Sequence, residues 1–99
     1  MISYAAHSYA AVYAARLNEK EKAERYRKSS LKLSAQDPHT HLRSALVLAQ
    51  LQRDRSALVE LEQAVKEGLS ASEITNDPTW RRFAADPKYS AIIARAQKK

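Results

Sequence analysis

Apolar residues recur along this chain at the three- and four-residue spacing that is typical of amphipathic helices, and short polar stretches separate the apolar segments. The spacing predicts helices over residues 2–17, 20–34, 38–51 and 55–67. The helix over 38–51 has apolar residues on more than one face, as expected of a helix that packs against neighbours on two or more sides. The pattern therefore predicts two helical hairpins, with the third helix innermost.

Helix boundary signals divide the rest of the chain. Gly68 is expected at the C-terminal end of the fourth helix, and Ser70 with Glu73 has the spacing of a capping box. Asp precedes Pro three times, an arrangement that caps and starts a helix, at Asp37-Pro38, Asp77-Pro78 and Asp86-Pro87. The last two pairs predict a short helix with Trp80, Phe83 and Ala84, and a final helix with Tyr89, Ile92, Ile93 and Ala96.

Composition agrees with an all-α fold. Among 99 residues there are one glycine and three prolines, 44% are hydrophobic, and Ala, Leu, Lys, Arg and Glu are abundant. This length predicts a single domain over residues 1–99.

The first predicted hairpin repeats in the second, about 34 residues further along the chain. We call this constant spacing the repeat offset. The polar turns align, with Asn18-Glu19 falling on Gln52-Arg53. Identical residues pair as His7 with His41, Ala11 with Ala45, Ala15 with Ala49, Leu17 with Leu51, Ala23 with Ala57 and Lys32 with Lys66.

A helix–turn–helix unit of about 34 residues resembles the tetratricopeptide repeat, over residues 4–68. The small residues Ala11, Ala45, Ala23 and Ala57 stand where that family packs helix against helix. The chain departs from the family at Arg27, which replaces a bulky apolar residue, and at the usual Trp position, which is histidine in both repeats. The resemblance implies an α-solenoid with repeat one at about 4–37, repeat two at about 38–69 and a helical cap at about 70–97. The cap is similar to segments that close such arrays in bacterial multidomain proteins.

In function, the resemblance implies a non-enzymatic scaffold that binds a peptide or partner protein in a concave groove, as part of a larger protein. Arg43, with His39 beside it, occupies a position of the carboxylate clamp that some family members have, and a full clamp is not expected. Two repeats fall short of a stable stack, so either the cap acts as a third unit, or the first helix docks on more repeats, on another domain or, by self-association, on a second copy of the chain. The groove positions implied by the family are Ser8, Tyr9, Val12, Arg16, His39, Leu42, Arg43, Leu46 and Gln50.

The formal net charge of +6 leaves a second interpretation open. Arg25, Lys28 and Lys32 form a basic stripe at helical spacing, which could bind RNA or an acidic protein. Alternatively, the stripe is a solvated outer face whose bases pair with Glu21 and Glu24 at i,i+4. Aromatic residues do not alternate with these bases, which makes nucleic acid the less favoured partner.

Catalysis, cofactors and metals are not expected. There is no cysteine, the single glycine excludes glycine-rich phosphate loops, and His39 and His41 at i,i+2 do not share a helix face. The sequence has no apolar run of the roughly 18 residues that a membrane span needs, so no insertion is expected. The start of the chain lacks a basic leader, and we favour the cytoplasm, although a cysteine-free chain leaves the compartment open.

Overall fold

The computed structural model describes residues 4–33 and 36–98, and the side chains of residues 4–8 lie outside this description. All secondary structure in these ranges is helical, so the all-α prediction is confirmed. The predicted helices at 38–51 and 55–67 are confirmed, with ends that differ by at most one residue. Those at 2–17 and 20–34 are confirmed as far as they are described, because residues 2, 3 and 34 lie outside the described ranges. The elements are α1 (Tyr4–Arg16), α2 (Lys20–Leu33), α3 (Pro38–Gln50), α4 (Asp54–Lys66), α5 (Ala71–Thr75), the 3₁₀ helix η1 (Pro78–Phe83) and α6 (Pro87–Gln97).

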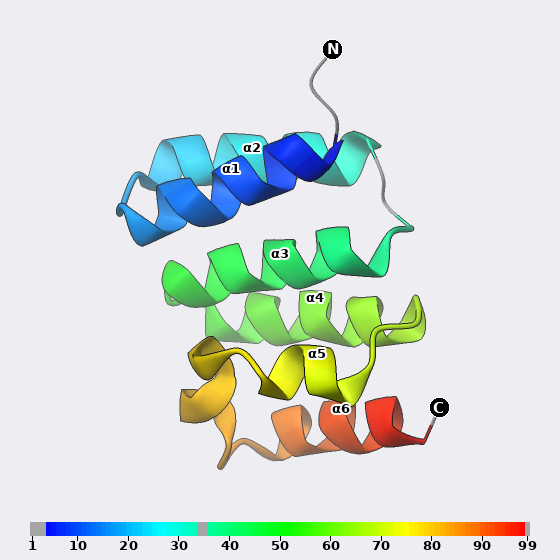
Figure 1. Ribbon diagram of the computed structural model, residues 1–99. Coiled ribbons are helices and arrows are strands. Elements are labelled where there is room, and N and C mark those ends of the chain that lie inside the picture. The colour runs from blue at the N-terminus through cyan, green and yellow to red at the C-terminus, as the bar shows by residue number, and fades with distance from the viewer. Residues whose placement is uncertain (1–3, 34–35, 99) are drawn as a thin grey trace.

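The helices pack in three layers (Figure 1). The first layer is the hairpin of α1 and α2, and the second is the hairpin of α3 and α4. Helix α3 contacts both α1 and α2, as predicted for an inner helix. The third layer holds α5, η1 and α6, and α6 packs against α4.

The two hairpin turns have the same backbone conformation at positions related by the repeat offset. Asn18 and Gln52 both adopt a left-handed conformation, with φ of 62° and 61°. The N–H of Glu19 donates to the carbonyl of Ala14 at 2.9 Å, and the N–H of Arg53 donates to Leu48 at 2.8 Å. These are the long hydrogen bonds of a Schellman motif, which satisfies carbonyls at the end of a helix. The predicted equivalence of the two turns is therefore confirmed.

Small residues let the helices approach closely. Ala11, Ala23, Ala45 and Ala57, which pair at the repeat offset, are all at most 1% exposed. Because alanine places little side-chain volume between two helices, the helix axes of each hairpin can lie close together. The sequence prediction that these four positions pack helix on helix agrees with their burial.

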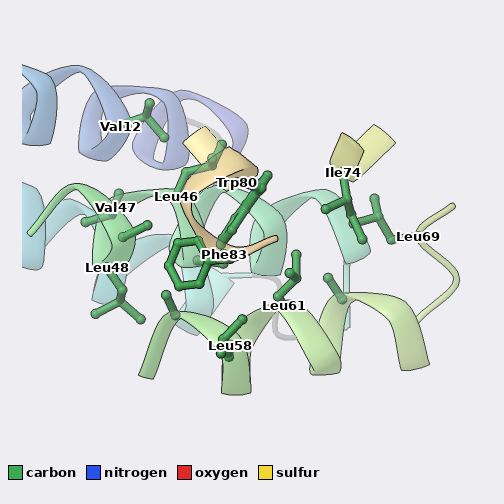
Figure 2. Packing of buried hydrophobic residues seen from close by; sticks show 14 of the residues in the cluster. Val12, Leu46, Val47, Leu48, Leu58, Leu61, Leu69, Ile74, Trp80 and Phe83 are labelled. Carbon is green, nitrogen blue, oxygen red and sulfur yellow. The ribbon is translucent and has the colours of Figure 1, made fainter. Parts of the chain in front are cut away.

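The third layer closes the core with aromatic side chains. Trp80, Phe83 and Tyr89 are buried, with ring centroids 5.3 Å apart for Trp80–Phe83 and 6.3 Å apart for Trp80–Tyr89. Figure 2 shows Trp80 and Phe83 in the middle of the cluster, amid side chains of α3 and α4. The three predicted Asp-Pro caps are confirmed, because Asp37, Asp77 and Asp86 each accept a hydrogen bond from the backbone N–H two residues later.

Some apolar residues that the helical pattern grouped with the core point outward. Leu33 was expected on the inner stripe of the second helix, and it is 55% exposed. Tyr13 and Leu17 of the first apolar pattern are 69% and 58% exposed, and Ala84 is exposed as well. The expectation for Leu33 was wrong, because periodicity finds an apolar stripe without indicating which neighbour, if any, covers it.

Candidate protein-binding surface

The predicted groove residues lie on α1 and α3, and they differ in exposure. Tyr9, Arg16, His39 and Gln50 are exposed, and Leu42 and Arg43 are half-buried. The side chain of Ser8 lies outside the described residues, so its predicted place in the groove stays a prediction. We call the exposed and half-buried set the α1–α3 face.

Two of the predicted groove residues belong to the core instead. Val12 is 9% exposed and Leu46 is 8% exposed, and both are part of the main hydrophobic cluster. Figure 2 shows them facing each other from α1 and α3. The expectation that they line an open groove is therefore corrected: their side chains hold α1 against α3 and leave little surface for a ligand.

A cation–π contact joins the two helices across the α1–α3 face. The guanidinium carbon of Arg43 lies 4.4 Å from the centroid of the Tyr9 ring. The ring is 64% exposed, so the pair presents an aromatic surface beside a positive charge. Such pairs contribute roughly 0.5–1 kcal/mol at exposed sites, enough to orient both side chains.

His39, at the start of α3, connects this face to the third layer. Its Nε2 lies 2.7 Å from Oε1 of Glu73 on α5. Glu73 also accepts a hydrogen bond from the backbone N–H of Ser70 at 2.9 Å, which confirms the predicted capping box. The backbone N–H of Ser70, together with His39 and the Ser70 hydroxyl, lowers the pKa of Glu73 to about 2. His39 is thus engaged by a carboxylate of the chain itself.

A polar network between the two hairpins is the main feature that the sequence did not reveal. Arg27 of α2 donates two hydrogen bonds to Glu24, at 2.9 and 3.1 Å, and one to the hydroxyl of Ser44 on α3 at 3.1 Å. Ser44 donates to Glu60 of α4 at 3.2 Å, and Nδ1 of His41 lies 2.7 Å from the other oxygen of Glu60. We call these five residues the interhairpin network.

The network lowers the pKa of the Glu24 carboxyl. Hydrogen bonding by the Arg27 guanidinium holds the pKa of Glu24 below its ordinary value of 4.5, although partial burial acts in the other direction. Arg53, at 3.5 Å from Glu24, lowers the pKa of this carboxyl further. The side chains of Arg27, Glu24 and Glu60 are only 13–18% exposed, so these charges depend on one another. His41, which pairs with His7 at the repeat offset, is buried, and its ring nitrogen lies within hydrogen-bond distance of Glu60.

The side of the first hairpin that faces away from the second carries an apolar hollow. Its volume is about 450 Å³, and Tyr9, Tyr13, Leu17 and Tyr26 provide most of its large side chains. At the repeat offset, Tyr13 and Tyr26 correspond to Val47 and Glu60, which are both at the contact between the hairpins. The hollow is therefore equivalent in position to the face that the second hairpin uses to pack on the first.

The basic stripe on α2 is exposed, and its predicted pairing is wrong. The described residues form no ion pair within 4 Å with Arg25, Lys28 or Lys32, so the expected Glu21–Arg25 and Glu24–Lys28 pairs are absent. Glu24 is taken by Arg27 and Arg53 instead. The three bases therefore face solvent.

The described part of the chain holds no group of three or more His, Cys, Asp or Glu side chains that is arranged to bind a metal ion. Within 4–33 and 36–98, no helix has the length and apolar character needed to cross a membrane. Comparison of the chain with models of protein families, with curated proteins and with solved structures found no match.

Proposed function

We propose that this chain is a non-enzymatic protein-interaction module, built as two tetratricopeptide-like repeats with a helical cap in a solenoid arrangement. The observation that carries the proposal is the recurrence of the helix–turn–helix backbone at the repeat offset, down to the left-handed Asn18 and Gln52. Stacked helical units of this kind expose extended surfaces, which suit the binding of peptides and partner proteins.

The partner binds along the α1–α3 face, with Tyr9 and Arg43 at its centre. Tyrosine and arginine dominate the binding energy of many protein interfaces, because each offers a large contact area and a polar group. Leu42 adds an apolar surface next to them, and Arg16 and Gln50 provide polar contacts at the edge. His39 belongs to the same face, held by Glu73.

Affinity capture with matched variants tests this proposal. We expect Tyr9→Ser combined with Arg43→Glu to abolish capture of the partners that the wild-type chain retains. The control is Tyr13→Ser combined with Arg81→Glu, which changes the same residue types outside the α1–α3 face and should leave capture intact. Circular dichroism establishes that both variants remain folded. Equal capture by the two double variants would show that the α1–α3 face is not the binding surface.

The exposed bases on α2 support a second candidate, the binding of an anionic partner such as RNA or an acidic protein. Arg25, Lys28 and Lys32 have no carboxylate partner among the described residues, so their charges are available. Binding of this kind falls steeply with salt and is lost when the three charges are reversed. Insensitivity to both changes would exclude it.

A further inference from the structure

A groove runs between α4 and α6, on a part of the molecule that the proposed function does not use. The two helices pack against each other and are parallel, with their N-terminal ends on the same side of the molecule (Figure 1). The hollow between them has a volume of about 260 Å³. The residues that line it are Arg55, Leu58, Val59, Glu62, Lys88, Ala91, Ile92 and Arg95.

Each helix contributes the same pattern of residues to the groove. The lining positions fall at i, i+3, i+4 and i+7 in both helices, with charged residues at the two ends and apolar residues between them. Leu58 and Ile92 are each 5% exposed and form the floor. Val59 is 66% exposed, and Ala91 is exposed too, so apolar surface remains open to solvent above the floor.

The charges around the groove are mainly positive, and two of them have no partner. Arg55 and Lys88 form no ion pair with any described residue. At the other end, the single groove carboxylate, Glu62, is shared by two bases, Lys66 at 3.4 Å and Arg95 at 3.7 Å.

Two further carboxylates near Arg55 and Lys88 are already engaged. Asp54 accepts a hydrogen bond from Arg82 at 2.9 Å and forms an ion pair with it at 2.8 Å. Asp86 accepts a hydrogen bond from the backbone N–H of Lys88 at 2.8 Å. The first turns of α4 and α6 therefore present two available cations beside an exposed apolar strip.

We propose that the α4–α6 groove binds an acidic peptide segment of a partner protein, with an aliphatic or aromatic side chain seated on Leu58 and Ile92 and its carboxylates against Arg55 and Lys88. The volume of about 260 Å³ is below the range of whole-ligand pockets, roughly 300–1,000 Å³, and it suits one or two anchoring side chains. An amphipathic segment in a groove between helices is an established mode of peptide recognition. The apolar floor provides affinity, and the basic end selects acidic sequences and sets the orientation.

The test uses fluorescence anisotropy with a labelled 12-residue probe that contains two leucines four residues apart and flanking glutamates. We expect the full chain to bind this probe, and to bind control peptides with Lys in place of Glu or Ser in place of Leu at least tenfold more weakly. Arg55→Glu combined with Lys88→Glu should weaken binding of the acidic probe at least tenfold, and Val59→Asp at least fivefold. Because Val59 is exposed, its substitution leaves the fold intact.

The matched control is Lys20→Glu combined with Arg81→Glu, which makes the same charge change at exposed residues outside the groove and should alter binding less than twofold. An equal loss in both double variants would overturn the proposal, because it would show attraction by net charge alone. Equal affinity for the Ser-containing peptide, or no binding at millimolar concentration, would overturn it as well. Tyr9→Ser combined with Arg43→Glu is expected to leave the probe bound, so failure of the groove and failure of the α1–α3 face are distinguishable.

Discussion

Arg27 shows how a single residue departs from the repeat without breaking it. The equivalent position in the second hairpin is Leu61, which is fully buried, whereas the guanidinium of Arg27 is bonded to Glu24 and Ser44 and lies 3.6 Å from Glu60. A charge at such a position is tolerated only when its partners are supplied by the neighbouring helices. The interhairpin network supplies them.

We predict that Arg27→Ala destabilises the chain by about 3 kcal/mol, because it leaves the carboxylates of Glu24 and Glu60 poorly solvated and without their guanidinium. Urea denaturation at neutral pH measures the change in the free energy of unfolding. The control is Arg25→Ala on the exposed side of the same helix, with an expected loss below about 0.5 kcal/mol. Similar losses for the two variants would contradict the structural role of the network.

The lowered pKa of Glu73 predicts how the stability of the fold depends on pH. Its folded pKa of about 2 lies below the ordinary value of 4.5, so the charged carboxylate stabilises the folded state above pH 4.5 and this stabilisation is lost as the pH falls through about 2. Wild type should therefore be more stable than Glu73→Gln at pH 6, and the difference should shrink between pH 4.5 and 2. Thermal melts of both proteins at several pH values measure it. A difference that is constant over this range would exclude the effect.

At the scale of elements, the turns of the two hairpins differ in how well their residues suit a left-handed backbone. Asn tolerates positive φ through local hydrogen bonding, whereas Gln has no such advantage. Gly68, at φ of 116° after α4, is the residue type that this conformation prefers.

We expect Gln52→Gly to stabilise the chain by about 0.5–1 kcal/mol, since relief of the left-handed strain outweighs the added freedom of the unfolded chain. Asn18→Gly should gain less, and Gly68→Ala should lose stability because alanine is strained at that φ. Differential scanning calorimetry of the wild type and the three variants measures their melting temperatures and so ranks their stability. Equal melting temperatures for wild type and Gln52→Gly would show that the turn is not strained.

Local signals in the sequence predicted the elements well, because each signal acts within a few residues. Asp37, Asp77 and Asp86 cap their helices through bonds that reach two residues along the chain, and the short period of apolar residues defined both ends of α3 and of α4 to within one residue. The site was less predictable. A charge such as Arg27 resembles an ordinary surface residue until the helix that carries Glu60 packs against it, and the burial of Val12 and Leu46 depends on the same contacts between hairpins.

At the scale of the whole molecule, the apolar hollow on the first hairpin brings exposed large hydrophobic residues together. Tyr9, Tyr13 and Leu17 are each more than half exposed there, on the face equivalent to an interior contact of the second hairpin. Exposed apolar surface of this kind marks an interaction site.

We therefore expect the isolated chain to self-associate at high concentration, and Tyr13→Glu combined with Leu17→Lys to keep it monomeric. Light scattering over a concentration series measures the average mass of each protein. Val59→Lys, at another exposed apolar residue, is the control and should associate as wild type does. A wild-type chain that stays monomeric throughout would indicate that the hollow is not a contact surface for a second copy.

The interhairpin network also fixes the order in which the two hairpins can stack. Arg27 contacts Ser44 and Glu60 of the second hairpin, and that hairpin carries Leu61 where the first carries Arg27. A chain in which the α3–α4 hairpin was duplicated would set Leu61 of one copy against Glu60 of the next, and that carboxylate would lose its guanidinium. Two units with nearly the same backbone are therefore not interchangeable, and only one order of assembly neutralises the buried charge at their junction.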